Sequence, residues 1–154
     1  MTDAPRPALR PVPGAFAALR LRPGDDLVAG LRAARDAMGA PAVAVVTCVG
    51  SLTDAVLRHA GRDGGTRYGG ADRPGPFEIV ALVGTIDPDR HHLHVAMADP
   101  EGRAFGGHAL PGCRVHTTAE VVLMALGGLA FRREPCPLSG YPELVVEDAG
   151  PASS

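Results

Sequence analysis

The sequence contains no lysine, so arginine supplies all 15 of its basic side chains. These arginines are spread along the chain, and only Arg132 and Arg133 are adjacent. With 17 acidic residues the formal net charge is −2, and the sequence pI is about 6.3. A protein that grips DNA through its phosphates typically carries a basic stripe and a high pI. The composition therefore disfavours direct DNA binding by a single chain.

Long apolar runs are also missing. No stretch approaches the roughly 20 apolar residues that a membrane-spanning helix needs, so we expect no membrane association. The Pro- and Arg-rich N-terminus has no hydrophobic signal core, and we expect no secretory leader. The three cysteines are an odd number and widely separated, which fits a reducing compartment better than a disulfide framework. We therefore expect a cytoplasmic protein.

What the sequence does contain is the composition of one globular domain. Its 154 residues are 45% hydrophobic and 21% charged, which suits a single unit with its own core. Residues 1–14 hold four prolines and no periodic apolar pattern, and they predict a flexible N-terminal arm. Residues 149–154 predict a disordered tail. A single folded domain is therefore expected at 15–148.

One helix is predicted with clear boundaries after the turn at Pro23. Asp25 or Asp26 is a suitable N-cap, and Gly39 is a suitable C-terminal stop. Between them, apolar residues recur at helical spacing, namely Leu27, Leu31, Ala34 and Met38. This segment is expected to pack its apolar stripe on a sheet.

Most of the remaining chain favours strands, which we predict at 15–22, 42–49, 77–86, 93–98, 103–110, 131–133 and 143–146. Residues 52–59 predict either a strand or a short helix, and the glycine-rich residues 61–76 predict a mobile loop. Residues 115–126 are ambiguous, because Thr117 and Glu120 also fit a capping box that would open a helix. One clear helix among many strands predicts an α+β fold, with a mostly antiparallel β-sheet and one main helix packed on it.

The segment from residue 91 to residue 108 carries the most informative pattern. His92 and His94 are two residues apart, so in a strand they point to the same face. The sequence Asp99-Pro100-Glu101-Gly102 predicts a three-residue hairpin turn with Asp99 opposite Arg103. Counting back along the two strands then places His94 directly opposite His108.

Three imidazoles on one face are the ligand set of an open zinc site. The spacing thus favours a site for zinc or another divalent transition metal at His92, His94 and His108. A two-residue turn would shift the register by one and send His108 to the opposite face. In that case these are surface or structural histidines, and both interpretations remain open on spacing alone. His91 is expected to lie in the preceding turn.

Several segments, in order, resemble the plants and prokaryotes conserved (PPC) domain, also called domain of unknown function 296. They are LRLRPGDDLVAGL, TCVGSLTDAVLR, GPFEIVALVGTI, HLHVAMADPEGRAFGGH, GCRVHTTAEVVL and GYPELVVE. Together they span roughly residues 17 to 147. The resemblance implies an α+β fold related to the acetolactate decarboxylase-like fold, a homotrimer, and a strand at 115–126.

The resemblance also bears on function. Acetolactate decarboxylase and a human zinc-dependent ester hydrolase share this broad fold and are similar in using a His-x-His pair and a later histidine. These correspond here to His92, His94 and His108, which implies a metal-dependent hydrolase or decarboxylase with a small-molecule substrate. Glu120 is a candidate catalytic acid or base, or a carboxylate that orients a ligand histidine; an edge or interface carboxylate explains it equally.

Two other functions stay open. Plant relatives often carry an AT-hook centred on Gly-Arg-Pro, and this tripeptide does not occur here. The chain is then either a non-catalytic trimeric scaffold that binds a protein partner, or a DNA-binding, transcription-regulating protein as the family is often described. Arg20, Arg22 and Arg58 are candidates for an anion site, although scattered strand arginines are usually solvated.

Overall fold

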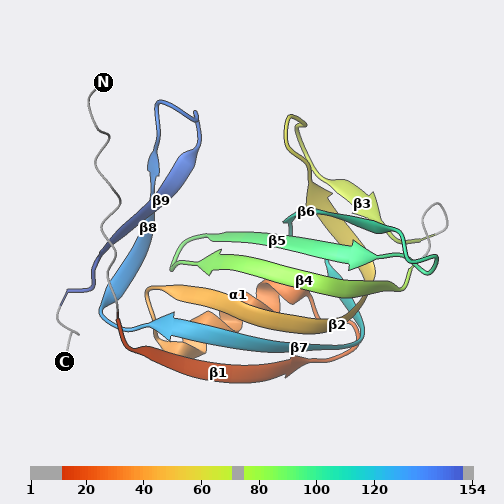
Figure 1. Ribbon diagram of the computed structural model, residues 1–154, viewed down its shortest axis with the longest axis horizontal. Coiled ribbons are helices and arrows are strands. Elements are labelled where there is room, and N and C mark those ends of the chain that lie inside the picture. The colour runs from red at the N-terminus through yellow and green to blue at the C-terminus, as the bar shows by residue number, and fades with distance from the viewer. Residues whose placement is uncertain (1–11, 71–74, 151–154) are drawn as a thin grey trace.

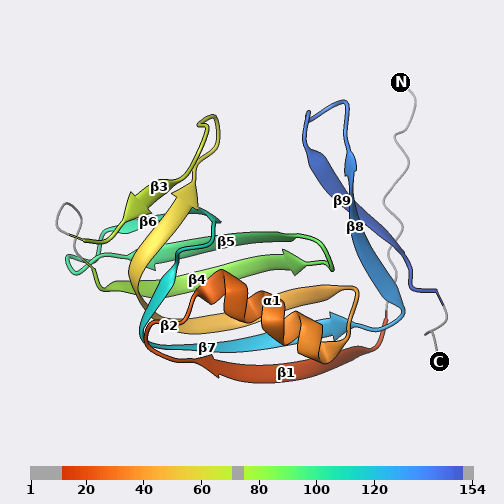
Figure 2. The same ribbon diagram turned by 180° about the vertical axis from the view of Figure 1, so that it is seen from behind.

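The computed structural model describes residues 12–70 and 75–150. They form one helix and nine strands, and Figures 1 and 2 show the helix lying across one side of the main sheet. The elements are β1 (Gly14–Leu21), α1 (Leu27–Met38), β2 (Val43–Arg58), β3 (Thr66–Tyr68), β4 (Phe77–Ile86), β5 (His91–Ala98), β6 (Ala104–Ala109), β7 (Arg114–Leu126), β8 (Leu129–Pro135) and β9 (Pro142–Asp148). The predicted α+β fold, a mostly antiparallel sheet with one helix, is confirmed.

The main sheet has the strand order β1-β7-β2-β4-β5-β6, and β3 pairs with β2. Every pair of strands in it is antiparallel. The last residues of β2 also pair with β6, through Leu57 with Ala109 and Arg58 with His108. The sheet thus curls until its β6 edge meets the end of β2, which brings Arg58 beside His108.

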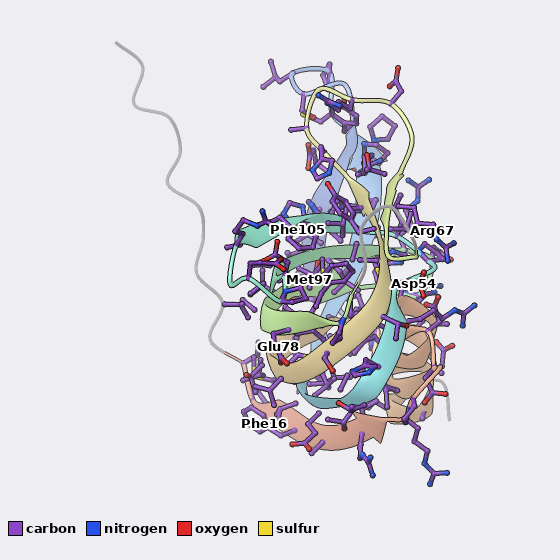
Figure 3. The ribbon with its side chains drawn as sticks, turned by 90° about the vertical axis from the view of Figure 1, so that its right-hand side faces the viewer. Phe16, Asp54, Arg67, Glu78, Met97 and Phe105 are labelled. Atoms are coloured by element: carbon purple, nitrogen blue, oxygen red, sulfur yellow. The ribbon has the colours of Figure 1, made fainter. Side chains whose placement is uncertain are left out.

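The two faces of the main sheet differ in what covers them. On one face α1 buries Leu27, Val28 and Leu31 in a core shared with strand residues, which include Leu52, Leu57, Phe77, Leu82, Ile86, Leu93, Met97 and Leu123. The other face leaves large apolar side chains exposed, namely Phe16, Val46, Val49, Val80 and Val83. Figure 3 shows Phe16 and Glu78 on the side of the sheet away from the helix. This second face is called the open face below.

The helix begins and ends where the sequence predicts. The Asp26 Oδ1 atom accepts a hydrogen bond from the Ala29 backbone N–H at 3.0 Å, and Gly39 ends the helix with φ 62°. Asp26 Oδ2 also accepts from the Gly112 backbone N–H at 2.6 Å, so the cap ties the helix start to the turn before β7. Over the described ranges, no helix has the length and apolar character needed to cross a membrane.

Two strand predictions are corrected. Residues 42–49 and 52–59 belong to one continuous strand, β2, and the short-helix alternative at 52–59 is wrong. Three register shifts against β7 interrupt the apolar alternation of β2, which is why its pattern resembles two elements. The capping-box helix at 115–126 is also wrong, because β7 is paired on both sides, with β1 and with β2. Pairing along both edges outweighs the local helix signal.

The glycine-rich segment 61–76 contains the short strand β3, and the Gly75–Pro76 peptide bond is cis. Residues 71–74 lie outside the described residues, as do 1–11 and 151–154, which hold most of the predicted arm and tail. The described chain enters β1 at Gly14, the last position of that predicted arm.

The β8–β9 hairpin forms a separate two-stranded sheet that projects beyond the main one (Figure 1), and its strands are longer than the predicted 131–133 and 143–146. An ion pair joins it to β4 and the turn that follows, with Arg133 Nε 3.4 Å from Asp87 Oδ2. Arg133 Nη2 also donates to Thr85 Oγ1 at 3.0 Å. The two paired side chains are only 8% and 3% exposed, so this anchor is buried.

Candidate metal centre

The turn between β5 and β6 sets the register of the histidines. The Asp99 backbone N–H donates to the Arg103 carbonyl oxygen at 3.1 Å, and the Gly102 N–H donates to the Asp99 carbonyl at 2.8 Å. Gly102 has φ 77°, the left-handed conformation expected of the last residue in this turn. The predicted three-residue hairpin is confirmed, and His94 lies opposite His108.

The three histidine rings converge outside the hydrophobic core. His92 and His94 alternate with buried core residues of β5, so both project from the open face. Their Nε2 atoms are 3.1 Å apart. The ring centroid of His108 lies 5.2 Å from that of His92 and 5.6 Å from that of His94. One nitrogen from each of the three rings lies within 4.8 Å of the others.

This arrangement fits a metal ion. Two nitrogens that each lie about 2.0–2.1 Å from a tetrahedral zinc ion are about 3.3 Å apart, close to the observed 3.1 Å. The Nδ1 atom of His108 is buried and has no hydrogen-bond partner among the described residues. A buried polar atom without a partner is costly, and metal coordination is one way to satisfy a ring nitrogen. The three histidines therefore could hold a metal ion.

Burial and neighbouring positive charge lower the pKa of two of these rings. Burial, and then the charge of Arg58, lowers the pKa of His108 to about 4. Burial, and then the neighbouring His94, lowers the pKa of His92 from its ordinary value. Metal binds the neutral imidazole, so at neutral pH an ion does not have to displace a proton from His108. The neutral form that coordinates a metal ion is thus favoured at His108.

Glu120 lies outside this group. It is exposed on β7, where it pairs with Arg20 of β1 and Val49 of β2. In the strand order β2 and β4 separate β7 from β5, so the chain's own fold does not bring Glu120 to the histidines. Glu120 alternates with buried Ala119 and Val121, so it lies on the open face. A Glu120 carboxylate at the histidines would therefore have to come from a second chain. Its catalytic role stays a prediction.

The histidines line an open cleft of about 1140 Å³. Its walls come from the end of β2 and the turn after it, the turn before β5, one side of α1, and the tip of the β8–β9 hairpin. In both ribbon views that hairpin and the β2–β3 turn extend toward the same side of the sheet (Figures 1 and 2). Arg58 lines this cleft, whereas Arg20 and Arg22 do not.

His91 and Glu143 are among the cleft residues that sequence reasoning missed. His91 is the first residue of β5 rather than part of a turn, and its ring stacks on that of His108 with centroids 6.3 Å apart. Glu143, at the tip of the β8–β9 hairpin, lines the cleft, and its charge acts to raise the pKa of His92. The residues around His91 and Glu143 show no pattern that would identify them as site residues, because long-range packing brings both to the site.

Known proteins similar to this chain include two of high identity. It is 43% identical over 135 residues to the bifunctional protein GlmU of Synechococcus sp. strain JA-3-3Ab, covering 88% of this chain. The chain spans about a fifth of the length of such curated relatives. A solved structure of a hypothetical protein from Salmonella enterica is 40% identical, with a TM-score of 0.84, and the match covers 90% of this chain and 97% of that one.

More remote structures share the fold alone. A metal-containing protein from Archaeoglobus fulgidus is 23% identical with a TM-score of 0.71, over 88% of this chain and 95% of that one. A candidate DNA-binding protein from Bacteroides thetaiotaomicron is 17% identical with a TM-score of 0.71, over 84% and 91%. The family itself is given by residues 11–127, which match the Plants and Prokaryotes Conserved (PCC) domain. This chain therefore belongs to the plants and prokaryotes conserved domain family, as the order of its segments predicts.

Proposed function

We propose that this domain is a metal-dependent enzyme in which His92, His94 and His108 hold zinc or a similar divalent transition ion. The observation that carries the proposal is the convergence of three imidazoles in a cleft, one of them with a buried nitrogen that lacks a partner. The metal-containing relative from Archaeoglobus fulgidus supports it. The odd cysteine number supports a cytoplasmic location.

The chemistry proposed is hydrolysis of a small ester or decarboxylation of a small keto acid. When bound, such an ion supplies Lewis acidity, which polarises a carbonyl or lowers the pKa of a water molecule. The chain's own residues hold the three imidazoles on one rigid hairpin and surround them with a concave wall. Three protein ligands leave a coordination position open, as catalytic sites require, whereas structural zinc sites are closed by four.

The first test is elemental analysis of untagged, dialysed protein. We expect about one transition-metal ion per chain in the wild type and none in His94→Ala, because two remaining imidazoles bind weakly. His116→Ala is the matched control, since His116 lies on β7 beside Ser51 and outside the cluster. It should keep its metal. No metal in the wild type would contradict the proposal and favour a non-catalytic scaffold that binds a protein partner.

We also propose that the chain assembles as a homotrimer through the open face. The support is the set of exposed apolar side chains there, of which Val80 is 63% exposed on a central strand. Exposed apolar patches commonly mark protein contacts. Glu120 and the histidines share this face, so a neighbouring chain is the available source for a carboxylate at the metal.

Light scattering tests this assembly. We expect a particle of three times the 15.8 kDa chain mass for the wild type, and smaller species for Val80→Glu, which buries a charge in the proposed contact. Leu138→Glu is the control, because Leu138 is 97% exposed in the turn between β8 and β9. A monomeric wild type, or a Val80→Glu variant that assembles normally, would count against this interface.

A further inference from the structure

Positive charge is concentrated in the cleft, although the chain as a whole carries a net charge of −2. Five arginines line it, Arg32, Arg58, Arg62, Arg90 and Arg133, against three carboxylates, Asp63, Asp89 and Glu143. A concave wall with one sign of charge raises the local concentration of ligands of the opposite sign. The cleft therefore favours an anion.

Only some of these arginines have a structural role. Arg133 is paired with buried Asp87, and Arg32 donates to the Pro88 carbonyl oxygen at 3.2 Å. The side chain of Arg58 is exposed and makes no hydrogen bond or ion pair with the described residues. Its backbone is nevertheless fixed, because Arg58 pairs with His108 where β2 meets β6. The backbone of Arg58 is thus fixed beside the histidine cluster, and its guanidinium has no partner among the described residues.

A guanidinium so close to the histidines works against a metal ion unless an anion also binds. Arg58 pairs with His108 where β2 meets β6, and it lines the same cleft as the three histidines. A divalent ion at the rings would meet repulsion from the positive charge of this guanidinium. An oxyanion that contacts both cations would remove it, and the planar fork of arginine matches a carboxylate or phosphate in two-point geometry.

We propose that Arg58 forms the anion subsite of this centre and that the natural ligand is a small molecule with a carboxylate or phosphate group. This rests on the proposed metal site and specifies its ligand class. A cleft of limited size on a chain of net negative charge favours a small anion over a polynucleotide, which needs an extended basic surface.

The test uses the 154-residue chain loaded with Co²⁺, whose visible spectrum reports changes at the ion. Titrations with pyruvate and with inorganic phosphate identify which oxyanion binds. We expect Arg58→Gln to lower the affinity for the anion by roughly 10-fold or more, because a charged hydrogen-bonded pair is lost. The anion affinity of Arg58→Lys should lie between those of the wild type and Arg58→Gln, since lysine keeps the positive charge and lacks the two-point geometry of the guanidinium. Metal content should stay that of the wild type.

Arg22→Gln is the control, because Arg22 is an exposed strand-end arginine that does not line the cleft. Equal anion affinities in wild type and Arg58→Gln would overturn the subsite. So would an Arg58→Gln variant whose affinity for duplex DNA falls by the same factor as its affinity for the small anion. Calorimetry on metal-free protein separates the two proposals. Arg58-dependent anion binding in a wild type that takes up no metal supports the subsite and rejects only the metal site.

Discussion

Arg133→Met is expected to lower the free energy of unfolding by about 3 kcal/mol, because removing one partner of a buried ion pair leaves the other charge uncompensated. Asp87 is 2% exposed, and its remaining partners among the described residues are the backbone N–H groups of Asp89 and Arg90. Urea unfolding, monitored by circular dichroism, measures this decrease in the free energy of unfolding. The same variant should speed amide exchange in β8 and β9, since this pair anchors the hairpin to β4.

The neighbouring residue provides the control. Arg132 is 46% exposed and pairs with Glu147 and Glu134 on the hairpin surface, where ion pairs contribute about 1 kcal/mol or less. Arg132→Met should therefore cost far less than Arg133→Met. The double variant Asp87→Asn/Arg133→Met should recover part of the loss, because neither charge is then left alone. Similar costs for the two arginine variants would show that burial of the Arg133 pair is unimportant.

Gly84→Ala is expected to have an effect of at least the same size. A Cβ atom at this position would lie 1.9 Å from the carbonyl oxygen of His92, and Gly84 has φ 141°, where other residues are strained. The β4 and β5 backbones would have to separate beside the histidine cluster. We expect more than about 3 kcal/mol of lost stability, together with loss of the proposed metal ion because His92 moves.

Gly102→Ala distinguishes the steric contribution from the conformational one. Gly102 also has a positive φ, 77°, yet nothing lies within 4 Å of the position of an added Cβ. Its cost should be about 1 kcal/mol, the ordinary penalty for a side chain in the left-handed region. Equal losses in the two variants would contradict the close approach of β4 to β5.

Local sequence signals were sufficient for the helix and for the histidine hairpin. Asp26 and Gly39 define their own helix ends, and Pro100 with Gly102 defines a turn that alone fixes His94 opposite His108. The register of β5 and β6 depends on adjacent residues, so counting along the chain is enough. Metal binding by the cluster is a prediction from the same spacing.

Strand pairing between distant segments could not be predicted from local sequence patterns. The continuity of β2 through its irregular register with β7, and the strand state of β7 itself, depend on partners far along the chain. The place of Arg58 beside His108 follows from curling of the sheet, and that of Glu143 from docking of the β8–β9 hairpin. Neither has a pattern in neighbouring residues that could identify it.

The meeting of β2 with β6 divides the centre into two parts of separate origin. The candidate metal ligands all belong to one continuous hairpin, β5–β6, whereas Arg58 and the turn after it belong to β2. If the centre works as proposed, substitutions at the end of β2 change which molecule is recognised while the candidate metal ligands stay as they are. Relatives that keep the hairpin and differ at Arg58 and in the following turn should hold the same ion and select different ligands.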